Sequence, residues 1–129
     1  MQRTHRFSVL SDMCAVARLR ADEPVPAWAL SAPGFVSITR TADELSVACC
    51  AADVPPECQA ERGWVIIKLH GPFPFAQVGV LESFAAPLAQ AGISIFAVST
   101  FDTDYILVKA AQIETAVAAL EGAGHTHAP

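Results

Sequence analysis

The sequence predicts an α+β protein, and three observations support this fold class. The 129 residues are 53% hydrophobic and 16% charged, a balance typical of a chain that folds around a packed core. Runs rich in β-branched and aromatic residues, which favour strands, recur along the chain. Two stretches in the second half, 80–90 and 113–120, instead space their apolar residues at helical intervals. Strands and helices therefore occur together in one chain, as they do in α+β domains.

The second half begins with a strand and a helix. Residues 64–70 are rich in β-branched residues and are followed by Gly71-Pro72, which predicts a strand that ends there. A helix is predicted over 80–90 from its apolar spacing. Pro87 lies inside this helix and is expected to kink or divide it, because proline removes a backbone donor. Gly92 is expected to cap its C-terminal end.

Two further strands and a second helix follow. The strands are predicted over 93–99 and 104–109, with a short turn between them. Apolar residues from Ile113 to Leu120 follow the i, i+3, i+4, i+7 spacing of an amphipathic helix. The order β-α-β-β-α is that of the ferredoxin-like unit without its last strand. The tail, residues 124–129, is predicted to be too short to supply a full strand.

The first half is predicted to contain little helix. Residues 7–10 and 14–19 are predicted as two separate strands, and 35–39 and 46–50 as two more around an acidic turn. Prolines at 55 and 56 stand where the second half has its helix.

A weak internal repeat relates the two halves. Thr39 corresponds to Ser99 and Glu44 to Asp104, which sets the halves 60 residues apart. In both, a strand, a hydroxyl residue, a tight turn, an acid and a second strand follow in that order. We therefore divide the chain into an N-terminal module, residues 1–61, and a C-terminal module, residues 62–129.

Charge and hydropathy exclude several classes of function. Thirteen acidic and eight basic residues give a net charge of −5, whereas a nucleic-acid-binding protein needs a basic surface. The same balance argues against a basic helix on a membrane surface. No apolar run approaches the ~20 residues of a spanning helix, and the first residues do not resemble a signal peptide. We expect a cytoplasmic protein with no nucleic-acid or membrane partner.

The four cysteines do not predict a metal site. Cys14, Cys49, Cys50 and Cys58 form no C-x-x-C motif, and the adjacent Cys49-Cys50 pair has the wrong spacing for two ligands of one tetrahedral metal. We expect reduced, buried or half-buried thiols. No cofactor is predicted.

No catalytic centre is predicted either. Ser99 and Thr100 have no nearby histidine suited to act as a base, and His125 and His127 are expected to be tail residues. Some small two-layer hydrolases hold the attacking water with an Arg and an Asn. This chain contains no asparagine, so it cannot form that pair. The protein is therefore not expected to be an enzyme.

The second half resembles a known family. The segment 92–108, which contains the string Ser-Thr-Phe-Asp-Thr-Asp-Tyr-Ile-Leu-Val, resembles the strand-turn-strand segment of ACT domains. It is similar in particular to the regulatory ACT domains of aspartokinases and to the cytosolic arginine sensor of the mTOR pathway. Residues 41–46, Trp64 and the segment 79–81 resemble small stand-alone bacterial proteins with two ACT-like modules. The resemblance covers residues from about 7 to 122 and implies two ferredoxin-like (βαββαβ) ACT-type modules, the first reduced in helix content.

This resemblance implies a function. ACT domains are regulatory modules that bind amino acids, usually between paired domains, and they carry no chemistry of their own. We therefore predict a non-enzymatic regulatory or sensor protein that binds an amino acid at an ACT–ACT interface of a homodimer. An incomplete sheet leaves a strand edge that a second copy would cover. The alternative is a structural or interaction protein with a degenerate ACT pocket, which acts through a protein partner.

Two segments are candidates for holding the ligand's backbone. Gly79, Val80 and Leu81 lie where a loop enters a helix, and the N–H groups and helix dipole there favour a carboxylate. The alternative is a glycine that serves only the tight entry. Ser94 and Ile95 match positions that hold the ligand's backbone in the arginine sensor, and an edge strand offers N–H and C=O groups. Alternatively, this edge pairs with another subunit.

Asp104 completes the candidate ligand-binding residues. It projects from the start of a predicted strand, where a carboxylate could pair with a cationic side chain or an α-amino group. Asp102, in the preceding turn, is instead expected to accept local backbone hydrogen bonds.

Overall fold

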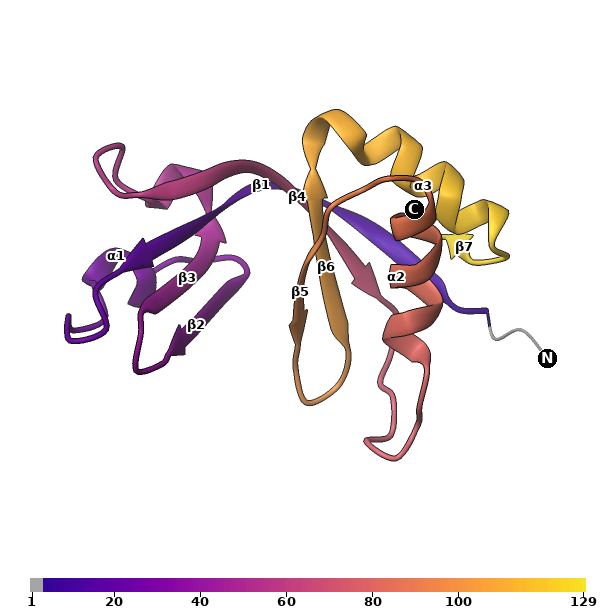
Figure 1. Cartoon of the computed structure of the whole chain (residues 1–129), viewed down its shortest axis with the longest axis horizontal. Helices are drawn as coiled ribbons and strands as arrows, with labels where there is room; N and C mark the ends of the chain where they lie inside the picture. Colours follow the sequence, from indigo (N-terminus) through magenta and orange to yellow (C-terminus); the bar gives the residue numbers. More distant parts are fainter. Residues whose placement is uncertain (1–3) are drawn as a thin grey trace. The chain divides into compact units, whose positions relative to one another are not determined.

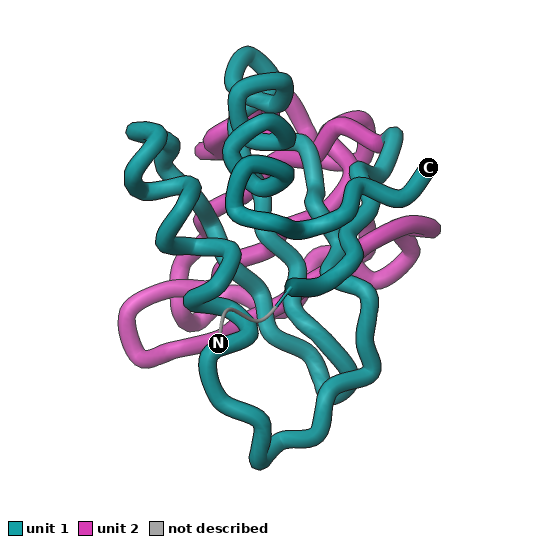
Figure 2. Tube along the Cα trace, turned by 90° about the vertical axis from the view of Figure 1, so that its right-hand side faces the viewer, with its two compact units in different colours: residues 1–11, 65–129 teal, residues 12–64 magenta. Residues whose placement is uncertain are grey.

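The computed structural model describes residues 4–129, which fall into two compact units. Unit 1 comprises residues 1–11 and 65–129, and unit 2 comprises residues 12–64 (Figure 2). Residues 1–3, which the predicted N-terminal module includes, lie outside the described residues. The remaining residues up to 11 belong to unit 1, whereas the division predicted from the sequence places them with the first half.

The two divisions differ because of a single long strand, β1 (Arg6–Leu19), which begins in unit 1 and continues into unit 2. The prediction of two separate strands over 7–10 and 14–19 was wrong. Ser11 and Asp12 are exposed turn-forming residues, but the strand passes through them without a break. Backbone pairing with neighbouring strands on both sides of β1 outweighs their local preference for a turn.

Unit 1 contains a sheet with helices on one face (Figure 1). Its strands are ordered β7-β1-β4-β6-β5, and β5 and β6 are antiparallel with Ser99 opposite Asp104. The bounds are β4 (Ala60–Leu69), whose residues 60–64 belong to unit 2, β5 (Phe96–Ser99), β6 (Asp104–Lys109) and β7 (Thr126–His127). The strand predicted over 93–99 thus begins at Phe96. The tail, predicted to be too short for a full strand, forms the two-residue β7 parallel to β1.

The two helices of unit 1 are α2 (Val80–Gln90) and α3 (Ile113–Gly122), as their apolar spacing predicts. A one-turn 3₁₀ helix, η2 (Ala110–Gln112), precedes α3. The core between the helices and the sheet is apolar. It contains Phe7, Ile67, Leu69, Phe84, Leu88, Ile106, Val108, Ala116 and Leu120, all fully buried.

Pro87 does not divide α2, contrary to one of the two expected effects. The missing N–H of Pro87 leaves the carbonyl of Ser83, four residues earlier, without its helical donor. His125 supplies a replacement, since its Nε2 lies 2.8 Å from the Ser83 oxygen. His125 was expected to be a tail residue, and this prediction was wrong: its side chain is buried against α2.

Unit 2 is smaller and contains mostly strand. The end of β1 pairs with β3 (Leu45–Cys50), which pairs with β2 (Val36–Arg40), and both pairings are antiparallel. Its helices are the four-residue α1 (Ala27–Leu30) and the 3₁₀ turn η1 (Ala51–Asp53). Its core is separate and apolar, and contains Ala15, Ala17, Ala29, Leu45, Val47, Cys49 and Val54. An α+β fold with a mostly antiparallel sheet is therefore confirmed.

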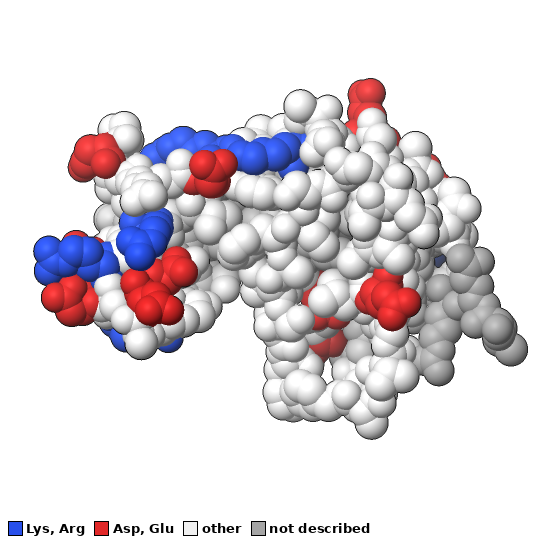
Figure 3. Space-filling model, in the orientation of Figure 1, with Lys and Arg blue, Asp and Glu red and all other residues white. Residues whose placement is uncertain are grey.

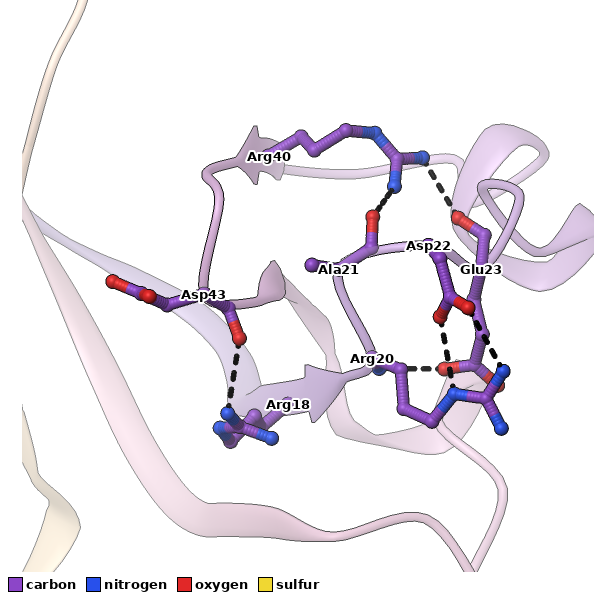
Figure 4. Close-up of polar contacts among 7 residues, drawn as sticks. All are labelled: Arg18, Arg20, Ala21, Asp22, Glu23, Arg40 and Asp43. Carbon is purple, nitrogen blue, oxygen red and sulfur yellow. Dashed lines mark hydrogen bonds and ion pairs between the residues drawn. The ribbon is translucent and has the colours of Figure 1, made fainter.

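Arginine side chains hold the loops of unit 2. Figure 4 shows Arg40, at the end of β2, donating to the carbonyls of Ala21 and Glu23, the latter at 2.8 Å. Arg20 instead makes an ion pair with Asp22 at 3.1 Å between two largely exposed side chains. Arg40 is exposed as well, but it donates to two backbone carbonyls of one loop, whereas Arg20 pairs with a side chain two residues away.

Replacing Arg40 by alanine is therefore expected to lower the free energy of unfolding by about 1 kcal/mol. Arg20→Ala is the matched control and should leave stability unchanged within error, since an exposed ion pair contributes little. Urea unfolding of the two variants and the parent chain measures both effects. Equal losses in the two variants would contradict the role assigned to Arg40.

Candidate functional site

Two loops of unit 1 are joined by hydrogen bonds. One loop, residues 70–79, connects β4 to α2, and the other, residues 100–103, connects β5 to β6. The buried hydroxyl of Thr103 donates to the carbonyl of Leu69 at 2.8 Å, and the N–H of Phe73 donates to the carbonyl of Asp102 at 2.8 Å. These bonds hold the turn against the loop that leads into α2.

Gly71 allows the two loops to come this close. A Cβ atom at this position would lie 2.7 Å from the carbonyl oxygen of Asp102, nearer than such atoms approach one another. Any larger side chain would push the loops apart.

The loops and the first turn of α2 line an open cavity of about 270 Å³. Four of the six residues predicted to bind the ligand line it: Gly79, Val80, Leu81 and Asp104. The rest of the lining consists of Phe73, Pro74, Phe75, Gln77, Ser99, Thr100, Phe101, Asp102 and Thr103.

Gly79 sets the start of α2. Its φ angle is 85°, in the left-handed region that favours glycine, and a Cβ there would contact nothing within 4 Å. The glycine therefore suits the chain's entry into the helix, and a contact of Gly79 with a ligand stays a prediction. The first helical bond runs from Ser83 N–H to the Gly79 carbonyl, so the amides of residues 80–82 precede it and have no partner within the helix.

Asp104 gives the cavity an acidic wall. Its side chain is half-buried, and one carboxylate oxygen accepts a hydrogen bond from the Ser99 hydroxyl on the paired strand. Asp102 lines the same space and is exposed. Among the described residues that line the cavity there is no Lys, Arg or His. On the face drawn in Figure 3, the coloured side chains over the lower part of unit 1 are acidic.

Two aromatic side chains at this site were missed by the sequence analysis. Phe75 and Phe101 pack edge to face, with ring centroids 4.9 Å apart, although they are 77% and 79% exposed. Two exposed rings in contact form an apolar patch, which is more informative than a single exposed apolar side chain. The available signal was their place in the sequence, since each phenylalanine lies in a loop rather than in a strand or helix.

Ser94 and Ile95 lie elsewhere. Both precede β5, where Ser94 is exposed and Ile95 packs partly against the core of unit 1. The cavity adjoins the opposite end of β5, at Ser99. Four residues of extended strand span about 13 Å, so one chain does not bring these two residues to the cavity.

A wider groove of about 840 Å³ follows α2 and α3. Its lining includes Gly79 but consists largely of small side chains such as Ala86, Ala119 and Gly122. Glu82, Ser83 and Gln90 also line this groove, but the smaller cavity brings an unbalanced acid, aromatic rings and the start of α2 together at two bonded loops, as specific ligand sites do. We therefore take the cavity at Asp104 as the candidate site.

Comparison with known proteins identifies the family. Residues 59–122 match the ACT domain model, and residues 12–57 match a second model, described only as an N-terminal domain. A solved structure of a protein from Agobacterium tumefaciens is 41% identical, with a TM-score of 0.92, over 98% of this chain and 93% of that chain. The chain belongs to the ACT domain proteins, as the resemblance predicted.

More distant structures share the fold. A Vibrio cholerae protein of unknown function, described as a possible transport protein, is 18% identical over 93% of this chain and 90% of that chain, with a TM-score of 0.76. The regulatory subunit of aspartate kinase from Thermus thermophilus is 15% identical over 89% of this chain and 96% of that chain, with a TM-score of 0.62. A search of functionally curated proteins gave no match.

Family membership supports a regulatory, ligand-binding role in general, because ACT domains are regulatory rather than catalytic. Among residues 4–129, none of the helices is both long and apolar enough to cross a bilayer.

Proposed function

We propose that this protein is a cytoplasmic, non-enzymatic regulatory sensor that binds an amino acid between the ACT domains of two copies of the chain. The observation that carries the proposal is the cavity at Asp104, which combines a carboxylate with the N–H groups at the start of α2. An amino acid carries one cation and one anion, so these two features complement it.

A second copy is part of the proposal because Ser94 and Ile95 stand at the far end of β5 from the cavity. One copy would offer the backbone of Ser94 and Ile95, and its partner would offer the helix entry and Asp104. Two equivalent sites per dimer result. The ferredoxin-like ACT domain of the second half holds the ligand, and the helix-poor ACT-like module of the first half contributes no residue to it.

The charges of the lining favour one class of amino acid. Asp102 and Asp104 are not balanced by a basic side chain among the described lining residues. A ligand with a cationic side chain gains a partner for each acid, whereas an acidic amino acid is repelled. The exposed rings of Phe75 and Phe101 favour the same cation.

A thermal-shift screen over the twenty amino acids tests this function. A ligand present at 100 times its dissociation constant stabilises a protein by about 2.7 kcal/mol, which is readily measured as a rise in Tm. Two partly buried charge-assisted contacts are consistent with micromolar to millimolar affinity. A flat response to every amino acid at millimolar concentration would contradict the sensor function.

Dimerisation is a separate prediction. The strand β5 forms one edge of the sheet of unit 1, and unpaired edges of soluble proteins are normally covered. One chain has a mass of 13.6 kDa. We expect multi-angle light scattering at tens of micromolar protein to give twice this mass. A monomer at that concentration would count against a site shared by two copies.

The second candidate is an interaction protein with a degenerate pocket. The exposed Phe75 and Phe101, together with the exposed Val78, favour it, since a patch of this kind often contacts another protein. The amino-acid screen separates the two, because an interaction protein would show no response to any free amino acid.

A further inference from the structure

Two cysteines of unit 2 face each other across a pair of strands. Cys14 on β1 and Cys50 on β3 are direct partners in the antiparallel register. Residues that are directly opposite in such a pair point to the same face of the sheet. The two thiols therefore share one face and one position along the strands.

The hydrogen-bond pattern shows which kind of pair this is. Arg18 lies four residues after Cys14 in the same uninterrupted register, and its N–H donates to Gln59 rather than to β3, at 2.9 Å. Backbone groups alternate between the two sides of a strand, so Cys14 also directs its N–H away from β3. Cys14 and Cys50 are thus a non-hydrogen-bonded pair, the closer of the two types.

This placement suits a disulfide. The Cα atoms of a non-hydrogen-bonded pair lie about 4.5 Å apart, inside the range of roughly 4.4–6.8 Å that disulfides span. The other two cysteines lie on the opposite face, since Cys49 belongs to the apolar core of unit 2 and Cys58 packs against it. Among the described residues, Cys14 therefore has one thiol opposite it, that of Cys50.

The two thiols differ in accessibility. Cys14 is buried, and burial, together with the neighbouring Cys50, Cys49 and Asp12, raises its pKa to about 11. Cys50 is half-buried, so a reagent in solution reaches it first. Burial and the raised pKa both make the Cys14 thiol a poor first nucleophile.

We propose that Cys14 and Cys50 form a reversible disulfide within one chain by exchange with a low-molecular-weight disulfide. The thiolate of Cys50 attacks one sulfur of that reagent, which breaks its S–S bond, forms a mixed disulfide and releases one thiolate. The Cys14 thiol then loses its proton to solvent and its sulfur attacks the Cys50 sulfur, which releases the second thiolate. Two protein thiols are oxidised to one disulfide, and one external disulfide is reduced to two thiols.

The product would join β1 to β3 at the Cys14–Cys50 end of their paired residues. The link closes the chain between residues 14 and 50, which contains α1, β2 and most of β3. Such a closure restricts the unfolded chain and raises the stability of the folded one. Oxidation is expected to raise the Tm, and a reducing agent to reverse the change.

Glutathione disulfide is the probe for the experiment. The reduced full-length chain is incubated with it, and the intact mass and the peptide map are measured. We expect the loss of two hydrogens, with no retained glutathione at this pair and a linked peptide containing Cys14 and Cys50. Cys14→Ser should instead retain one glutathione on Cys50, because the second exchange lacks its thiol.

Cys49→Ser and Cys58→Ser are the matched controls, and both should still form the link. Tm measurements establish that each variant is folded before its oxidation is compared. A stable mixed disulfide on Cys50 of the parent chain would overturn the proposal. A link that involves Cys49 or Cys58, or resistance of the folded chain to the reagent, would also overturn it.

Discussion

Replacement of His125 by alanine is expected to lower the free energy of unfolding by about 3 kcal/mol and the Tm by about 10 °C. The side chain is only 4% exposed, and its ring stacks on Phe84 with centroids 3.9 Å apart. Its Nδ1 accepts a hydrogen bond from the N–H of His5 at 3.1 Å. The opposite nitrogen, Nε2, is then the donor to the carbonyl of Ser83.

The loss is large because the Ser83 carbonyl has no helical alternative. Proline at position 87 removes the N–H that would otherwise reach it, so removing His125 leaves this oxygen without that donor inside the protein. The same change withdraws the acceptor of His5 N–H, beside which Thr126 N–H donates to the His5 carbonyl. One imidazole therefore supplies the hydrogen bonds that join α2 to His5, just before β1, in addition to the apolar contact between Phe7 and Phe84.

His127 provides a matched control, because it lies two residues after His125, in β7, and is exposed. Its ring stacks on Phe7 at 5.0 Å, so His127→Ala should cost less than His125→Ala. His125→Phe keeps an aromatic ring while removing both nitrogens, and should recover part of the loss. Thermal and urea unfolding of the three variants measures these effects. Similar losses in the two alanine variants would contradict the role of His125.

The helices and most strands could be predicted because each follows from a periodicity within about ten residues. The spacing of apolar residues defines α2 and α3, and the β-branched runs define the end of β4 and all of β6. Because each of these patterns lies within a short segment, a single sequence is enough to recognise it.

The contacts of His125 and β7 could not be predicted, because their partners are distant in the sequence. Thr126 pairs with Arg6, and His125 accepts from His5, across nearly the whole length of the chain. Nothing near residue 125 in the sequence indicates these partners. The single strand β1 escaped prediction similarly, since its continuity through Ser11 and Asp12 depends on pairing with distant segments.

The candidate site was predicted in part. The helix entry and Asp104 do line one cavity, and they were selected from a resemblance together with the chemistry of these residues. Phe75 and Phe101 were missed because their proximity follows from the bonds between two loops. Ser94 and Ile95 stay a prediction, which only a ligand-bound dimer can test.

Replacement of Asp104 by alanine is expected to weaken amino-acid binding about tenfold or more, equivalent to at least about 1.4 kcal/mol. The cavity has two acids, and Asp104 is half-buried whereas Asp102 is exposed. Water therefore competes less with a ligand cation at Asp104 than at Asp102. The fold should persist, because a side chain at the start of a strand contributes little packing. Isothermal titration with the amino acid that gives the largest thermal shift measures the affinity, and the Tm without ligand measures the stability.

Three matched variants separate the charge of Asp104 from its place in the turn. Asp104→Asn keeps the shape and an oxygen that can accept from Ser99, but removes the negative charge. Ser99→Ala keeps the charge and removes its donor, and Asp102→Ala removes the exposed acid of the same turn. If the charge binds the ligand, Asp104→Asn loses affinity at unchanged Tm, and the other two lose less. If Asp104 serves only the turn, Asp104→Ala and Ser99→Ala lower the Tm together while the affinity stays that of the parent chain.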